Sequence, residues 1–300
     1  MKISKQRNAA AVNSQLIRRP IQRCFAIFLL PTFLTFCIGF LWPFLHGLYL
    51  SFCKFTITSN AKWVGFANYQ KALQDPSFMH AFWYTALVAV SSLIIINVLA
   101  FAVAYALTRG IKGSNVFRGV FFMPNLIGGI VLGYIWSVIF AGVLSRYHTA
   151  LVLNSAYGYW GLIILMCWQQ IGYMMIIYIA GLQSVSEDMI EAAKIDGANG
   201  WHILWKITIP TVMPSITICT FLSLTNGFKL FDQNLVLTNG RPFIGAIHTT
   251  EMLALNIYNS FYLNSNSRGV GQAKAVLFFI LVAAIALVQL RATHSKEVQQ

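Results

Sequence analysis

Long apolar runs without a charged side chain constrain this chain more than any other feature. The first extends from residue 24 to residue 52 and contains no Lys, Arg, Asp or Glu. A helix needs about 20 apolar residues to cross a bilayer, and this run exceeds both that length and the length of a signal-peptide core. Similar runs recur along the 300 residues, so the sequence predicts a polytopic membrane protein.

The predicted fold is an all-α membrane protein with six transmembrane helices. We expect a first span at 24–52, after a basic cytoplasmic tail at 1–23. The main transmembrane unit is expected at 81–291, with spans at 81–108, 119–143, 160–183, 211–236 and 270–290, a polar loop at 184–210 and a tail at 292–300. An outer segment at 249–262 has apolar residues at about helical spacing, which favours packing on the outer helix ends over lying along the membrane surface.

The distribution of charge fixes the expected orientation. Only 10% of the residues are charged, against about a quarter in a soluble domain. The net charge of +13 would suit nucleic acid, but the basic residues flank the spans instead of lining one face. Thirteen of the 21 Lys and Arg residues fall in segments expected inside and six in segments expected outside. The positive-inside rule then predicts a multi-pass protein of the cytoplasmic membrane with both termini cytoplasmic, and no nucleic acid partner.

The loop at 184–210 is a polar island between two apolar segments. It holds four of the eight acidic residues, namely Glu187, Asp188, Glu191 and Asp196. Ser184 and Glu187 have capping-box spacing, which predicts the start of a helix. Gly197 suits its end, because glycine adopts the left-handed conformation without a Cβ clash. A second short helix is expected from Trp201 to Ile209 and should end at Pro210, which cannot continue the hydrogen-bond ladder. These features alone favour a solvated connection with two short helices.

Three short motifs in this loop add a resemblance. They are Glu191-Ala192-Ala193, Asp196-Gly197-Ala198 and Lys206-Ile207-Thr208-Ile209-Pro210. Together they resemble the "EAA" loop of permease subunits in binding-protein-dependent ABC importers, most closely the sugar-importing, maltose-type branch. That pattern often ends in Leu-Pro, where this chain has Ile209-Pro210. The resemblance covers roughly residues 82–290 and implies a type I importer permease fold. It also implies a coupling helix that docks in a cleft of a separate ATPase subunit, with the residues Glu191, Ala192, Ala193, Asp196 and Gly197.

The same resemblance implies a set of partners. They are a second homologous permease, a dimer of ATPase subunits, an extracytoplasmic sugar-binding protein and the sugar itself. The sequence contains no Gly-x-x-x-x-Gly-Lys-[Ser/Thr] loop, no Gly-x-Ser-x-Gly elbow and no His-Glu-x-x-His motif. Its five cysteines and six histidines lack metal-ligand spacing. We therefore expect a transport subunit and not an enzyme, with no metal or cofactor of its own and with ATP bound by the ATPase partner.

Polar groups inside the fourth span indicate a functional site, because such groups are costly in a membrane. Gln169, Gln170 and Tyr173 lie there within two helical turns. They could hydrogen-bond neighbouring helices or line a substrate cavity. Tyr173-Met174-Met175 is similar to the stretch of maltose-type permeases in which a tyrosine lines the sugar site. Gln170 falls where that family's sugar permease carries a glycine.

The fifth span carries a polar stripe with helical spacing, formed by Ser223, Asn226, Gly227 and Leu230 and continued by Gln233 or Asn234. Ser223 matches a sugar-site serine of the resembled family, whereas Asn226, Gly227 and Leu230 differ in identity. Lys229 and Asp232, three residues apart, either pair with each other or contact sugar hydroxyls. We predict that Tyr173, Ser223 and Asn226 face one midplane cavity and contact the transported sugar.

Neutral polar groups beside aromatic rings suit a sugar. The stretch Gly-Phe-Lys-Leu-Phe-Asp-Gln-Asn, which contains Lys229 and Asp232, resembles one common in oligosaccharide-importing members of the family, and this resemblance implies an oligosaccharide. A polyamine site should carry carboxylates in the cavity, and a glycerol phosphate site should carry arginines; spans four and five offer neither pattern. Two alternatives remain. One is the same importer class with glycerol phosphate or a polyamine as its solute. The other is a self-contained secondary transporter, which should show inverted repeats and an ion site of its own.

Overall fold

The computed structural model describes residues 27, 29–238, 243–244, 247–248 and 250–294. The expected basic tail at 1–23 lies outside the described residues, as does most of the expected tail at 292–300. The helices are α2 (Trp42–Ser51), α3 (Ala67–Gln74), α4 (Pro76–Leu107), α5 (Ser114–Phe122), α6 (Gly129–Leu144), α7 (Ser155–Gln183), α8 (Glu187–Ile195), α9 (Gly200–Ile203), α10 (Ile209–Thr211), α11 (Met213–Phe228), α12 (Asp232–Leu237), α13 (Leu253–Tyr262) and α14 (Arg268–His294). Two short antiparallel ribbons pair β1 (Cys53–Lys54) with β2 (Lys62–Trp63) and β3 (Phe243–Ile244) with β4 (Ile247–His248).

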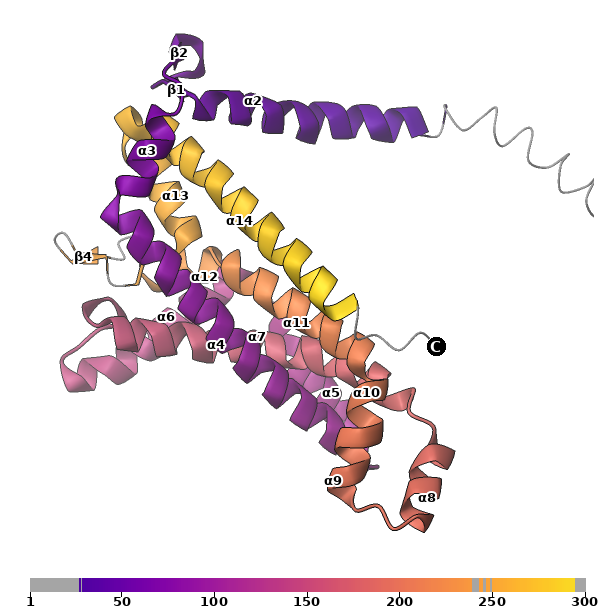
Figure 1. Ribbon diagram of the computed structural model, residues 1–300. Coiled ribbons are helices and arrows are strands. Elements are labelled where there is room, and N and C mark those ends of the chain that lie inside the picture. Colours follow the sequence, from indigo (N-terminus) through magenta and orange to yellow (C-terminus); the bar gives the residue numbers. More distant parts are fainter. Residues whose placement is uncertain (1–26, 28, 239–242, 245–246, 249, 295–300) are drawn as a thin grey trace, which may run out of the picture.

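The helices confirm the expected all-α membrane fold. Among the described residues, five helical stretches are long and apolar enough to cross a membrane, at 29–51, 76–107, 129–147, 155–183 and 265–289. A sixth span results if two helical stretches that meet at a 70° bend, 200–211 and 213–228, are counted as one. Figure 1 shows β1, β2 and α3 at one end of the bundle and α8 with α9 at the other. We call these the hairpin end and the loop end.

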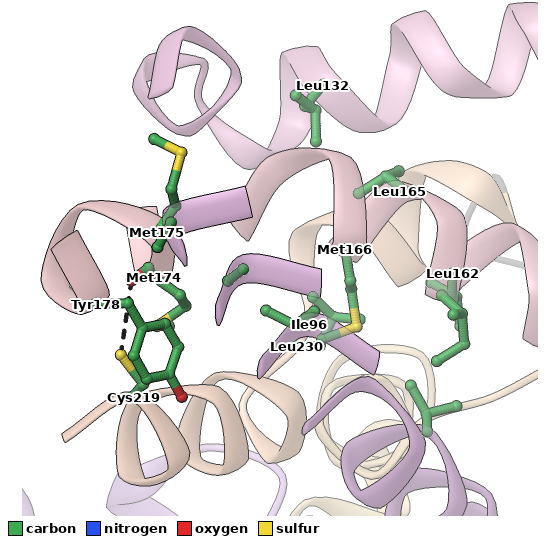
Figure 2. Packing of buried hydrophobic residues seen from close by; sticks show 14 of the residues in the cluster. Ile96, Leu132, Leu162, Leu165, Met166, Met174, Met175, Tyr178, Cys219 and Leu230 are labelled. Carbon is green, nitrogen blue, oxygen red and sulfur yellow. Dashed lines mark hydrogen bonds between the residues drawn. The ribbon is translucent and has the colours of Figure 1, made fainter. Parts of the chain in front are cut away.

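The core forms where α4, α7 and α11 pack together. Figure 2 shows Ile96 of α4, Met166 and Met174 of α7 and Cys219 of α11 in this cluster. The thiol of Cys219 donates to the carbonyl oxygen of Met174 at 3.7 Å. These apolar side chains explain why α7 is the most buried of the candidate spans: 56% of its most apolar 18-residue stretch is buried. Of the other candidate spans, α14 packs against α11 and α6 packs against α7 at the edge of this three-helix centre.

The first span stands apart from this core. It extends away from the bundle and approaches α14 near the hairpin end (Figure 1). The rings of Phe44 and Phe279 meet there with centroids 5.1 Å apart. Only 6% of the most apolar 18-residue stretch of this span is buried, so most of its apolar side chains are exposed outside the bundle.

The expected third span at 119–143 is wrong as a continuous helix. Helix α5 ends at Phe122, a 3₁₀ turn (η3) follows at Met123–Leu126, and α6 begins only at Gly129. Pro124 explains the break, because proline lacks the backbone N–H that would continue the helical ladder. Ile127 and Gly128 are extended and separate the two helices.

The expected fifth span at 211–236 is also interrupted. Helix α11 ends at Phe228, and α12 begins at Asp232 after a short break. Asn234 of α12 holds the second piece in place: its amide donates to the carbonyl of Thr250 at 2.8 Å and accepts from the N–H of Met252 at 3.1 Å. The polar stripe therefore does not continue along one helical face beyond residue 228.

The segment leading into α11 departs from its prediction too. A helix was expected from Trp201 to Ile209, with its end at Pro210. Instead α9 passes through a π-helical turn at Leu204–Thr208 into α10, and the sharp bend comes at Val212. Pro210 lies near the end of this continuous helical stretch, and because proline has no backbone N–H, the helix lacks one hydrogen bond there.

A buried polar network fixes the hairpin end. The Lys274 side chain is only 2% exposed, and its Nζ donates to Asp75 at 2.6 Å, to Asn256 at 2.9 Å and to Ser260 at 2.8 Å. Burial alone would raise the pKa of the Asp75 carboxyl, but the Lys274 ammonium and hydrogen bonds from Ser77 hold this pKa below its usual range. The network joins α4, α13 and α14. Packing of α13 against the bundle was the expected arrangement for the outer segment, and it is confirmed.

The two members of this ion pair should differ in their effect on stability. Asp75→Asn keeps a side chain that can cap α4 but leaves the buried Lys274 ammonium without its ion-pair partner, so we expect a loss of about 3 kcal/mol. Lys274→Met should cost less, because Asp75 is 31% exposed and water can solvate its carboxylate.

Thermal unfolding of the purified complex in detergent at pH 7 measures both effects. Because the folded-state pKa of Asp75 is lowered, the stabilisation it contributes is present above its unfolded pKa of about 3.9 and is lost as pH falls through the lower folded value. A larger loss for Lys274→Met than for Asp75→Asn would contradict this account.

Candidate functional site

A polar cavity of about 320 Å³ lies where α7, η3 and the α11–α12 break meet. We call it the amide cavity because five of its side chains are carboxamides. It is lined by Asn125, Gln169, Gln170, Asn226, Lys229, Leu230, Phe231, Asp232 and Gln233. The interruptions in spans three and five therefore coincide with the cavity. Irregular backbone at membrane depth is tolerated where it lines such a cavity or is buried in protein.

Two pairs of carboxamides join the cavity walls. The Gln233 amide donates to Gln169 at 2.9 Å, and the Asn226 amide donates to Gln170 at 3.4 Å. Each carboxamide has two N–H donors and an oxygen with two acceptor positions, so these bonds use only part of its capacity. The arrangement can offer both donors and acceptors to a neutral polar ligand.

Charged and apolar groups complete the cavity. Lys229 and Asp232 both line it, but no salt bridge joins them within the part of the chain that the structure describes. The alternative in which Lys229 and Asp232 mainly neutralise each other therefore lacks the ion pair that it requires. Leu230 is buried and also belongs to the hydrophobic core, while the Phe231 ring packs on Tyr258 with centroids 5.3 Å apart.

Three predicted site residues do not line this cavity. Tyr173 packs against the hydrophobic core. Gly227 lets α11 approach α4 closely, since a Cβ there would lie 2.8 Å from the Cα of Ala89. Ser223 is fully buried and accepts from Asn97 at 3.0 Å. Of the three residues expected to share one cavity, only Asn226 lines it.

Ser223 instead belongs to a polar cluster that joins three spans. Asn97 of α4 donates to Ser223 of α11 and accepts from the hydroxyl of Tyr178 of α7 at 2.6 Å. Asn97 also donates to the carbonyl of Leu93 at 2.7 Å. Ser223 therefore forms a hydrogen bond between helices and does not line the amide cavity.

Asn125 and Phe231 are lining residues that the sequence did not predict. Asn125 lies in η3, and the sequence contained only an indirect signal, Pro124 followed by two glycines, that the third span breaks there. Phe231 lies in the second break, whose residues 229–231 include neither proline nor glycine. Gln233 could be found from its place in the polar stripe of span five.

The loop at 184–210 projects from the loop end (Figure 1). Helix α8 has no buried residue; Glu191, Ala192, Asp196 and Gly197 are exposed, and Ala193 is half-buried. Gly197 has φ of +83°, as its expected role at a helix end requires. The predicted capping box is wrong: Ser184 ends α7 and donates to Gly181, while Ser186 precedes α8 without a side-chain cap.

A larger cavity of about 820 Å³ separates this loop from the bundle. Its walls are the ends of α4 and α7 on one side and α8, α9 and the π-helical turn on the other. Arg109 lies at the wall, 4.4 Å above the ring of Tyr105. The exposed α8 is therefore joined to the bundle mainly through its two ends.

The described residues contain no cluster of His, Cys, Asp and Glu that could hold a metal ion. A helical bundle of membrane spans with a polar cavity between them and an exposed helical loop at one end defines a membrane permease. The chain belongs to the family described as "Binding-protein-dependent transport system inner membrane component", which matches residues 96–293. It is thus a multi-pass permease subunit of an ABC importer, and such subunits are not themselves enzymes.

Relatives and solved structures agree with this assignment. The chain is 40% identical to "Probable starch degradation products transport system permease protein AmyD" of Thermoanaerobacterium thermosulfurigenes, covering 91% of this chain and 94% of that protein. It is 30% identical to "Multiple sugar-binding transport system permease protein MsmF" of Streptococcus mutans, covering 90% and 95%. A chain from a bacterial ABC transporter "involved in the import of the acidic polysaccharide alginate" has the same fold, with a TM-score of 0.77, 19% identity and coverage of 93% and 98%.

Proposed function

We propose that this permease forms half of the translocation pathway for a neutral oligosaccharide, and that the amide cavity contacts it. The observation that carries the proposal is the gathering of five carboxamides around one cavity, with Phe231 beside them. Sugar hydroxyls both donate and accept hydrogen bonds, which suits carboxamides, and a pyranose face suits an aromatic ring. The two relatives named for starch degradation products and for multiple sugars support the same class.

The charge of the cavity favours a neutral sugar over an anion. Lys229 and Asp232 contribute one charge of each sign, and none of the arginines that the structure describes lines the cavity. Glycerol phosphate or an acidic saccharide would leave the Asp232 carboxylate facing a like charge, and a polyamine would do the same to Lys229.

The proposed partners and orientation follow the basic-residue asymmetry and the exposed loop. In this arrangement both termini and the loop end are cytoplasmic, and α8 docks on one subunit of an ATPase dimer, which binds ATP. The contacting residues would be Glu191, Ala192, Ala193, Asp196 and Gly197. A second permease completes the pathway, and a sugar-binding protein delivers the solute at the hairpin end.

Competition for uptake tests the substrate class. Proteoliposomes containing the complete importer would take up labelled maltotriose in the presence of excess unlabelled solutes. We expect maltose and maltotetraose to compete, while glycerol 3-phosphate, alginate trisaccharide and spermidine do not. Competition by any of the charged solutes at the concentration of the neutral sugars would contradict the proposed class.

The role of the cavity can be tested with two variants one helical turn apart. Asn226→Ala removes a cavity carboxamide, so we expect a three- to tenfold rise in the apparent KM for maltotriose, the loss of one hydrogen bond. The control is Ser223→Ala, which removes a bond between helices and should lower the melting temperature with little change in KM. Equal KM values for Asn226→Ala and the wild type would contradict a contact with the sugar.

A further inference from the structure

Asn125 differs in origin from the other residues of the amide cavity. The described lining residues otherwise come from α7 or from the segment 226–233, whereas Asn125 lies in η3 of the broken third span. It therefore supplies a carboxamide from a third wall.

The α5 side of the turn is held against α7. Gly172 is buried, and a Cβ at this position would collide with the carbonyl oxygen of Phe121 near the end of α5. The backbone of α5 thus rests directly on the backbone of α7, two residues beyond Gln170. Pro124, at the start of the turn, is buried as well.

The α6 side of the turn is held against α12. A Cβ at Gly129 would lie 2.9 Å from Oδ2 of Asp232 and 3.3 Å from Nε2 of Gln233. One helical turn further on, a Cβ at Gly133 would lie 3.1 Å from Cβ of Val236. Asn125 consequently lies between two close contacts, one to the backbone of α5 and one to side chains of α12, each beside a carboxamide of the cavity.

The neighbouring residue in the same turn has a different environment. Leu126 is 71% exposed and does not line the cavity, whereas Asn125 is half-buried and does. A polar side chain at membrane depth is costly unless it faces protein or a water-filled cavity. The break in the helix thus directs an amide to the cavity and an apolar side chain away from it.

We infer that Asn125 is a substrate contact that determines which sugars the permease accepts. Asn125 adds a hydrogen-bond donor and an acceptor from a wall that α7 and the α11–α12 segment do not form. It can therefore distinguish sugars by hydroxyl groups that the other two walls do not contact. This inference rests on the proposed sugar function.

The first test compares Asn125→Ala with Leu126→Ala in the reconstituted importer. Uptake of maltotriose and of raffinose gives kcat and KM for each sugar. We expect Asn125→Ala to raise the KM for at least one sugar three- to tenfold and to change the ratio of the two kcat/KM values at least threefold. Leu126→Ala should leave that ratio unchanged. An equal loss for both sugars would indicate a structural role and overturn the inference.

The second test needs no sugar. In a background lacking the five native cysteines, Asn125→Cys and Leu126→Cys would be exposed to a small hydrophilic thiol reagent in the assembled importer. We expect labelling of Asn125→Cys and not of Leu126→Cys; the reverse would overturn the inference.

The inference and the proposed function can fail separately. If the importer transports these sugars and Asn125→Ala keeps the wild-type selectivity, the inference is overturned but the proposed function is not. Failure of the wild type to transport any neutral sugar would overturn the proposed function and the inference with it.

Discussion

Replacing Gly197 with proline is expected to abolish sugar-stimulated ATP hydrolysis by the assembled importer while the spans remain folded. Gly197 has φ of +83°, and proline is confined to about −65°, so the turn between α8 and α9 cannot keep its geometry. The neighbouring helix α8 has no buried residue, so little of the bundle depends on this turn. We therefore expect Gly197→Pro to impair the docking of α8 and to leave the core folded.

The control for this variant lies three residues further along. Gly200→Ala places a methyl group in open space at a helical position with an ordinary backbone conformation. It should retain stimulated hydrolysis close to that of the wild type. The measurement is ATP hydrolysis in proteoliposomes with and without the binding protein and maltotriose. Wild-type stimulation by an assembled Gly197→Pro complex would mean that the loop does not couple the permease to its ATPase.

Replacing Gly172 with valine is expected to prevent stable folding of the bundle. The backbone of α5 approaches so closely that even a Cβ collides with the Phe121 carbonyl. A backbone atom cannot move aside as a flexible side chain can, so α5 and the turn η3 must shift as a unit. We expect a loss of about 3 kcal/mol or more, at the upper end of the range for overpacking.

Thermal unfolding of the purified complex, together with its yield, measures this effect. Gly142→Val is the matched control, because this glycine lies in α6 with no heavy atom near its Cβ position. It should unfold at nearly the wild-type temperature. A Gly172→Val complex with an unchanged melting temperature would show that the close contact between α5 and α7 does not hold the broken span.

The number and type of spans could be predicted from sequence because hydropathy is a local property of each run. The breaks were harder to find. Pro124 marks the first break, yet prolines elsewhere in this chain, such as Pro43 in α2, lie within continuous helix. The second break depends on the bonds of Asn234 to Thr250 and Met252, which are long-range contacts that no local pattern encodes.

Part of the cavity could also be predicted from local sequence. Gln169, Gln170 and Asn226 were found because polar side chains inside apolar spans must face protein or a cavity. Ser223 met the same criterion and faces Asn97 instead. Hydrogen bonding between helices and contact with a substrate give the same sequence pattern, so only the packing of the helices separates them.

The central claim is that this permease carries a neutral oligosaccharide only as part of an ATP-driven importer. The most direct measurement is uptake of labelled maltotriose into proteoliposomes that contain this permease with its partner permease, the ATPase dimer and the binding protein. We predict uptake that requires ATP on the side of the loop end and that stops when the ATPase dimer is left out. Uptake that continues without the ATPase, driven by a proton or sodium gradient, would contradict the account and identify a secondary transporter.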